Sequence, residues 1–344
     1  MRRGPLSLGF VLSVLGCALA GAFCIVHAQP PQKPANDTGA AGGLRFIESG
    51  QPPVMIHPTV DAAKAAHGSR PGGGGSKNLY YHGGIGGIGV ETKPTIYLVL
   101  WGSQWNGSDP SGEESILVSF FSGVGDSSWS NTVTQYCQGN IPSGTYFCNG
   151  AGTPAGNPTG IFAAAWYDNA TAAPSRPSQS QLAAEAVRAA GFFGNVTAAS
   201  NASVQYVIAT AHGYNASGFG TQYCAWHSST SSSYGTIAYT NLPYITDAGA
   251  SCGANFNGLG PNAGITIVEG HEMAETITDQ FPNGGWLDGG GAEIGDKCAW
   301  ISSGQGAATG IALTVGTSTE NFPVQSLWSN AFNSDAGGCV ISYP

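Results

Sequence analysis

Charged residues are scarce in this chain and make up only 9% of its 344 residues. Lysine and arginine together number 11, against 20 aspartates and glutamates, which gives a formal net charge of −9. Nucleic acids and anionic membranes attract proteins with an excess of positive charge, so this balance argues against both as partners. With so few charges, glycine, serine, threonine and asparagine must cover much of the surface.

Beyond its first 28 residues the chain also lacks an apolar run long enough to span a bilayer. Residues 1–28 place Arg2 and Arg3 before an apolar stretch and end in small residues around Ala28, which is typical of a secretory signal peptide. We therefore expect a secreted protein, extracellular or periplasmic, with no membrane contact after signal cleavage. Lipidation at Cys17 is a weaker alternative, because that cysteine lies very early in the apolar stretch.

No C-x-x-C pair is present, which disfavours a cysteine-based zinc site. Six cysteines remain after residue 28, an even number that favours three disulfides in an exported chain. Proximity along the chain favours the pairs Cys137–Cys148, Cys224–Cys252 and Cys298–Cys339.

Residues 29–77 are rich in proline, alanine and glycine and predict a disordered linker or a propeptide. Two apolar patches, 44–47 and 54–56, could dock on a folded domain as a propeptide would, but the composition favours disorder. The folded domain is expected over residues 78–344.

Within that domain, β-branched and aromatic runs predict buried strands at 95–101 and 204–210. Helices are expected over 111–121, 178–190 and 262–278, and the tail from residue 310 to 342 has a β-like pattern. Strands that alternate with helices indicate one α/β domain with a mixed sheet, braced by the disulfides.

Acidic residues are crowded into residues 268–298. Unpaired carboxylates repel one another, so this crowding in a chain with little charge calls for a cation. The segment holds seven of the 20 acidic residues: Glu269, Glu272, Glu275, Asp279, Asp288, Glu293 and Asp296.

His271 and Glu275 are four residues apart, so on a helix their side chains lie on one face and can reach one cation. Glu272 follows His271, as the general base does in zinc peptidases with the motif H-E-x-x-H. Here the motif reads H-E-x-x-E. As third ligand we prefer Glu293, which follows a glycine-rich turn, and Asp296 is either an alternative ligand or a hydrogen-bond partner of His271.

Zinc is the expected ion, one per chain, because it accepts both imidazole nitrogen and carboxylate oxygen. The extra carboxylate makes calcium or manganese more credible than in a two-histidine site. A structural calcium site suits clustered acidic residues but leaves His271 unexplained. A solvated helix face without any metal is the remaining interpretation. Asp279 and Asp288 are expected to cap or stabilise the loop.

Two further histidines could stabilise an oxyanion or bind substrate. His212 follows the strand predicted at 204–210, and His227 lies close to Cys224, although structural hydrogen bonding is favoured for each. Aromatic residues could also line a sugar-binding platform, but such residues are more often core. These are Tyr81, Trp101, Trp105, Trp226 and Trp286.

Several motifs resemble the phosphate-induced, Exordium-like family of secreted proteins. The likeness includes Tyr-Tyr-His-Gly-Gly at 80–84, the strand at 96–101 followed by glycine, and Gly-His-Glu-Met-Ala-Glu at 270–275. It continues through Gly-Trp-x-Asp at 285–288 and Glu-Ile-Gly-Asp-x-Cys at 293–298, and so covers roughly residues 79–300. The resemblance implies an extracellular protein and supports metal roles for His271, Glu275 and Glu293, with Glu272 as base.

The first expectation is therefore a secreted metal-dependent hydrolase, most simply a zincin-like peptidase acting on peptide or protein substrates. Glu272 would take a proton from the attacking water, and His212 or His227 would stabilise the oxyanion. The alternative is a non-enzymatic Exordium-like protein that binds cell-wall or other glycans and holds structural calcium. An inert secreted structural protein is a third, weaker alternative.

Overall fold

The computed structural model describes residues 42–68 and 78–344, which lie within the unit Thr38–Pro344. The predicted signal peptide, residues 1–28 with Cys17, lies outside the described residues. So do residues 29–41 and 69–77 of the predicted linker.

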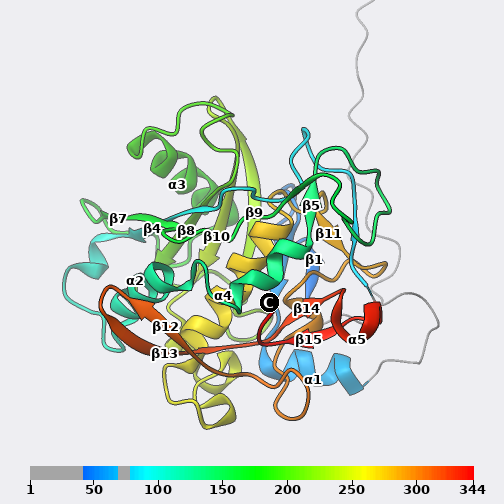
Figure 1. Ribbon diagram of the computed structural model, residues 1–344. Coiled ribbons are helices and arrows are strands. Elements are labelled where there is room, and N and C mark those ends of the chain that lie inside the picture. The colour runs from blue at the N-terminus through cyan, green and yellow to red at the C-terminus, as the bar shows by residue number, and fades with distance from the viewer. Residues whose placement is uncertain (1–41, 69–77) are drawn as a thin grey trace, which may run out of the picture. The chain divides into compact units, whose positions relative to one another are not determined.

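The centre of this unit is a mixed seven-stranded sheet with the strand order β1-β2-β9-β10-β8-β4-β7 (Figure 1). Four neighbouring strands, β7, β4, β8 and β10, run parallel to one another, and β9, β2 and β1 add antiparallel pairs at one end. The bounds are β1 Gly43–Arg45, β2 Val54–His57, β4 Thr95–Trp101, β7 Phe162–Asp168, β8 Val204–Thr210, β9 Ala225–Ser232 and β10 Gly235–Leu242. The prediction of an α/β fold with a mixed sheet is confirmed.

Helices cover both faces of the sheet. On one face, α2 (Glu113–Val124) and α4 (Ala263–Thr278) pack against it, and on the other lies α3 (Gln179–Phe192). The alternation of side chains along β4 explains the two cores, since Leu98 and Leu100 join the α2 and α4 side while Val99 joins the α3 side. The sheet is therefore buried on both faces, as its near-continuous apolar strands require.

The helices predicted from the sequence are present with small shifts at their ends. A capping box begins α3, because the Ser178 hydroxyl accepts the N–H of Gln181 while the Gln181 side chain accepts the N–H of Ser178. The β-like tail forms two hairpins, β12 (Thr309–Val315) with β13 (Ser318–Val324), and β14 (Leu327–Ser329) with β15 (Gly338–Val340).

Shorter elements complete the described part of the chain. They are α1 Val60–Gly68, α5 Phe332–Asp335, β3 Tyr80–Tyr81, β5 Cys137–Gln138, β6 Thr153–Pro154, β11 Trp286–Leu287, and the 3-10 helices η1 Ser103–Asn106, η2 Ser130–Gln135, η3 Ile245–Cys252, η4 Phe256–Gly258 and η5 Asp296–Cys298.

The disorder predicted for residues 29–77 is wrong for residues 42–68. Val54, Met55 and Ile56 are almost fully buried in β2, which pairs with β9 inside the main sheet. The surrounding prolines and glycines conceal this short apolar strand in the composition, but its pairing with β9 satisfies its backbone and buries its side chains.

All three predicted disulfides are present, at Cys137–Cys148, Cys224–Cys252 and Cys298–Cys339. Disulfides of this number fit an extracellular protein. In the described residues, no helix combines the length and apolar character needed to cross a membrane.

Candidate metal centre

Helix α4 supplies the first residues of the site. All of its residues are buried, and its i, i+4 spacing brings His271 Nε2 to 3.0 Å from Glu275 Oε2. A helix buried on every side carries polar groups only where they have partners or a ligand. The predicted pairing of His271 with Glu275 on one helix face is therefore present.

The chain then turns and brings a second acidic segment back against α4. Glu275 Oε1 accepts the backbone N–H of Gly295 (3.2 Å) and of Asp296 (2.9 Å), which ties the return segment to the helix. Gly295 lies against the imidazole of His271, and an added Cβ there would stand 2.5 Å from Nδ1. The close approach requires glycine at this position.

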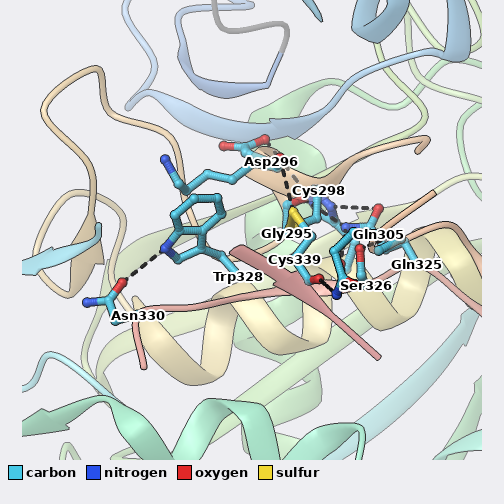
Figure 2. The surroundings of a disulfide bond; sticks show 12 residues. Gly295, Asp296, Cys298, Gln305, Gln325, Ser326, Trp328, Asn330 and Cys339 are labelled. Carbon is cyan, nitrogen blue, oxygen red and sulfur yellow. Dashed lines mark hydrogen bonds and ion pairs between the residues drawn. A yellow bond between two sulfur atoms is a disulfide. The ribbon is translucent and has the colours of Figure 1, made fainter. Parts of the chain in front are cut away.

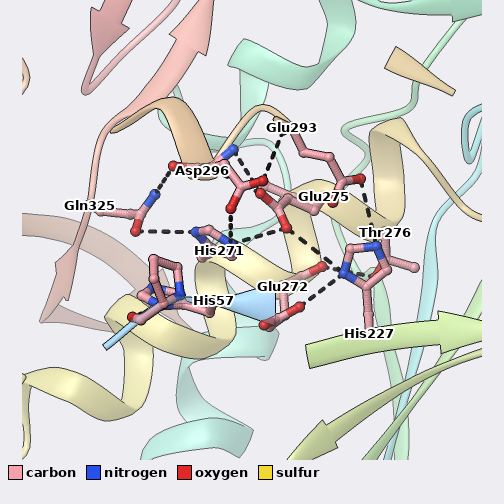
Figure 3. Close-up of polar contacts among 12 residues, drawn as sticks. His57, His227, His271, Glu272, Glu275, Thr276, Glu293, Asp296 and Gln325 are labelled. Atoms are coloured by element: carbon pink, nitrogen blue, oxygen red, sulfur yellow. Dashed lines mark hydrogen bonds and ion pairs between the residues drawn. The ribbon is translucent and has the colours of Figure 1, made fainter. Parts of the chain in front are cut away.

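Two groups of ligand atoms could hold a metal ion, and they share Glu275 (Figure 3). One consists of His271, Glu275 and Asp296, with His271 Nε2 3.9 Å from Asp296 Oδ1. The other consists of His227, Glu272 and Glu275. The group around His271 thus contains Asp296, which the sequence analysis gave as the alternative ligand.

Glu293, which the sequence analysis preferred as third ligand, lies beside His227 and not in the His271 group. Its Oε1 is 3.6 Å from His227 Nε2, and neither of its carboxylate oxygens has a hydrogen-bond partner among the described residues. It is fully buried and faces the same acidic cluster. Glu293 therefore belongs to the centre, although it is not in the His271 group.

His227 reaches the centre from β9. Its Nδ1 is 2.9 Å from Glu272 Oε2 and 3.8 Å from Glu275 Oε2, and its side chain is fully buried. The sequence analysis gave His227 as a catalytic candidate. Its contact with α4 could not be predicted, because that contact depends on the register of β9 in the sheet. Glu272 lies at Nδ1 of His227 and Glu293 lies near its Nε2, so His227 has a carboxylate beside each ring nitrogen.

His57, at the end of β2, is a residue of the centre that the sequence analysis missed. Its ring lies 4.0 Å from the ring of His271, centroid to centroid, and is fully buried. His57 Nδ1 faces the carbonyl of Pro58 (2.9 Å), and His57 Nε2 has no hydrogen-bond partner in the described residues. The only signal for it was the apolar patch at 54–56 immediately before it.

Gln325 fixes the imidazole of His271. Its amide nitrogen donates to the carbonyl of Gly295 (2.8 Å), so its amide oxygen faces His271 Nδ1 (3.3 Å). That oxygen accepts a hydrogen bond from Nδ1–H, which leaves the Nε2 lone pair directed toward Glu275 and Asp296. An outer hydrogen bond of this kind sets the tautomer that a metal ligand needs.

The electrostatics of the centre favour a bound cation. Burial lowers the pKa of both His227 and His271 to about 3, so neither imidazole carries positive charge at neutral pH. Burial also raises the pKa of Glu275 to about 8. The pKa values of Glu272 and Glu293 are raised well above the usual range, by burial first and then by the charge of Glu275.

Asp296 has the same environment, since burial and the charge of Glu275 raise its pKa. Several atoms of the centre are buried without a hydrogen bond in the described part of the chain, namely Nε2 of His57, His227 and His271, Oε1 of Glu272, Oε2 of Glu275, both oxygens of Glu293, and Oδ1 of Asp296. Such atoms are costly unless something binds them. This donor set fits a divalent cation.

Disulfide Cys298–Cys339 holds the return segment in place (Figure 2). It joins η5, which begins at Asp296, to β15, while Gln325 and Ser326 lie nearby and contribute hydrogen bonds. The ligand-bearing loop is thus anchored covalently at its C-terminal end.

Asp279 and Asp288 stabilise the turn, as expected. Asp279 accepts the backbone N–H groups of residues 283, 284 and 285. Asp288 accepts those of residues 290 and 292 and pairs with Lys297 at 2.6 Å. Neither aspartate belongs to a metal group among the described residues.

His212 is not part of the centre. Its Nδ1 pairs with Asp247, and in the described residues it forms no hydrogen bond or ion pair with the metal groups. A G-x-S-x-G spacing at 249–253 surrounds Ser251, but it lies across the 3-10 helix η3 rather than at a strand-to-helix turn. No histidine bonds to Ser251 in the described part of the chain. The structure therefore gives no support to a serine nucleophile.

Comparison of the chain with protein-family models, curated proteins and solved structures found no match. The resemblance to the Exordium-like family therefore stays a prediction, and the site has to be interpreted from its own geometry.

Proposed function

We propose that this protein is an exported metal-dependent hydrolase that cleaves peptide bonds, with one zinc ion held by His271, Glu275 and Asp296. The observation that carries the proposal is the convergence of buried imidazole and carboxylate atoms without hydrogen-bond partners. The three disulfides support an extracellular location, and the first 28 residues support a signal peptide.

The His271 group is the better zinc site of the two. His271 has a neutral amide at Nδ1 and a free Nε2, whereas His227 faces a carboxylate at each ring nitrogen. The separations of 3.0 and 3.9 Å from His271 Nε2 to the two carboxylates bracket the roughly 3.3 Å expected between zinc ligands at about 2.0 Å. Calcium takes six to eight oxygen ligands and suits an imidazole-containing group poorly.

A bound zinc ion would supply Lewis acidity toward water and toward a carbonyl group. Glu272 is adjacent to His271, and its Oε1 has no hydrogen bond while its Oε2 is held by His227 Nδ1. The positive charge of the bound ion would lower the pKa of Glu272 and keep it ionised, so that it would accept a proton at Oε1 from the attacking water. As the peptide C–N bond breaks, Glu272 would return that proton to the leaving nitrogen, so that one water is added per bond cleaved.

His227 would act as a positioning residue for Glu272. Its Nδ1–H holds one oxygen of the base, which leaves the other oriented for proton transfer. This role replaces the oxyanion role considered for His227. His212, the other candidate for that role, pairs with Asp247 and forms no hydrogen bond with the centre in the described residues.

The glycan-binding alternative receives little support from the aromatic residues. Trp226 and Trp286 are fully buried, and Tyr81 and Trp105 are nearly so, which leaves only Trp101 half-buried among the five. A sugar platform needs exposed ring faces. The same burial fits the expectation that these aromatics belong to the core.

The test compares wild type with Glu272→Gln and His271→Ala, measuring zinc content and then hydrolysis of a peptide library. We expect Glu272→Gln to retain zinc and to lose turnover by at least about 100-fold, since general acid–base catalysis contributes about 10²–10⁴. His271→Ala should lose both. Retained cleavage in Glu272→Gln would refute the assignment of the base.

A further inference from the structure

The N-terminal segment, defined as residues 42–68, lies directly over the metal centre. His57 packs on the ring of His271, and Gly42 lies so close to the Asp296 carboxylate that any side chain there would collide with it. The segment therefore contacts two of the three residues assigned to zinc.

The centre has no exposed ligand while this segment is in place. His271, Glu272 and Glu275 are 0% exposed, and Asp296 is 6% exposed. A peptide bond cannot reach Glu272 in that arrangement, so the hydrolase needs a state in which something has moved.

The rest of the chain donates four hydrogen bonds to main-chain carbonyls of this segment, besides one from the Gln179 N–H to the Glu48 side chain. The Trp300 indole donates to the carbonyl of Pro58 (2.7 Å), and the Ser228 hydroxyl donates to the carbonyl of Pro53 (3.1 Å). The Gln179 amide donates to the carbonyl of Pro52 (2.9 Å), and the backbone N–H of Cys224 donates to the carbonyl of His57 (2.9 Å). Such contacts are compatible with many sequences.

The segment also uses the standard geometry of an added strand. β2 pairs antiparallel with β9, and its register places Met55 opposite His227 and His57 opposite Ala225. An extended peptide that adds to a sheet edge gains affinity from main-chain hydrogen bonds in the same way. A peptide extended along β9 in this register would therefore lie beside His227, which bonds to Glu272.

We propose that the N-terminal segment occupies, in cis, the binding groove for an extended peptide substrate along β9, and that the full chain is a latent form. His57 is the blocking residue, since its fully buried ring packs on the ring of His271. The inference that the groove leads to catalysis depends on the proposed hydrolase function. The inference that it binds an extended peptide does not.

The first test frees the segment. A protease recognition sequence replaces the glycines at 72–75, the chain is cut, and residues 42–68 are removed in mild urea. We expect the remaining protein to keep its fold and its zinc, to bind a labelled peptide of residues 48–59, and to cleave the peptide library at least tenfold faster than the uncut chain. Adding the unlabelled peptide of residues 48–59 should lower the cleavage rate again, toward that of the uncut chain.

A second test leaves the chain intact. The double variant Gln179→Ala, Ser228→Ala removes two donors to the segment and should raise the rate of hydrogen exchange along β2 by about tenfold, with Ser231→Ala on exposed β9 surface as the control. Cutting an equivalent recognition sequence placed in the turn between β12 and β13 controls for cleavage itself.

The outcomes separate the two proposals. If the freed protein binds zinc and the peptide but cleaves nothing, the groove stands and the hydrolase function is wrong. If it unfolds or fails to bind the peptide, and if the double variant exchanges like the control, β2 is a permanent strand of the sheet and the latent-form proposal is overturned.

Discussion

Replacing Glu275 with glutamine probes the residue that both candidate metal groups share. Glutamine has nearly the same shape, and its side-chain oxygen can still accept the N–H groups of Gly295 and Asp296. The backbone of the return segment should therefore stay in place. Oε2 of Glu275, which faces His271, is replaced by the nitrogen of a neutral amide. That nitrogen cannot supply the anionic oxygen ligand that the proposed zinc site needs.

The size of the effect follows from metal linkage. A residue that only orients a metal ligand typically contributes about 10- to 100-fold in affinity, so loss of a direct ligand should cost at least about 100-fold. At a zinc concentration of about 1,000 times the native Kd, bound zinc adds about 4 kcal/mol to the free energy of unfolding. A site that binds about 100-fold more weakly would add only about 1.4 kcal/mol.

Glu269→Gln is the matched control. Glu269 is also on α4, is fully buried, and has no hydrogen bond to either carboxylate oxygen, but it belongs to neither metal group in the described residues. Its pKa is raised well above the usual range, by burial first and then by Glu113. The amide should remove an unfavourable buried acid and leave zinc binding intact.

Urea unfolding with and without zinc, together with competition against a chromophoric chelator, measures both quantities. We expect zinc-dependent stabilisation in wild type and Glu269→Gln, and its near loss in Glu275→Gln. Equal zinc affinity in the two variants would refute the role of Glu275 and, with it, the location of the centre.

Three further predictions concern pH, packing and covalent bracing. Burial raises the pKa of Glu91 to about 8, so the folded chain holds this proton more tightly than the unfolded chain does. Burying Glu91 therefore lowers the free energy of unfolding progressively as pH rises from about 4.5 toward 8. Glu91→Gln should raise the free energy of unfolding by about 3–5 kcal/mol at pH 9 and hardly at all at pH 4. Urea unfolding at the two pH values measures the difference. Gly295→Ala places a Cβ against the His271 ring and should cost about 1–3 kcal/mol together with most of the zinc affinity; unchanged affinity in chelator competition would contradict the close packing. Removing Cys298–Cys339 by serine substitution opens a 41-residue separation and should cost about 4 kcal/mol and weaken zinc, whereas removing Cys137–Cys148, with its separation of 11, should cost about 3 kcal/mol in urea unfolding and leave zinc content unchanged.

The part of the site that the sequence predicts is the part that depends on local geometry. The spacing of His271 and Glu275 requires only a helix, and helix propensity with apolar residues around the motif predicts one. The strands at 95–101 and 204–210 are likewise visible as apolar runs, and the disulfide pairs follow chain proximity. Each of these features is determined by neighbours within a few dozen residues.

The residues that come from distant elements could not be predicted in the same way. His227 reaches Glu272 through the register of β9, and His57 reaches His271 through the pairing of β2 with β9. Register is a tertiary property that no single segment encodes. Asp296, and not Glu293, lies in the same group as His271 because of the way the return segment is held against Glu275, which spacing alone does not reveal.

The central claim is that His271, Glu275 and Asp296 hold one zinc ion, and metal content by mass spectrometry on the purified chain tests it most directly. Wild type should contain about one zinc per chain, and His271→Ala should contain almost none while remaining folded. Equal metal content in the two proteins, or calcium in place of zinc, would contradict the account.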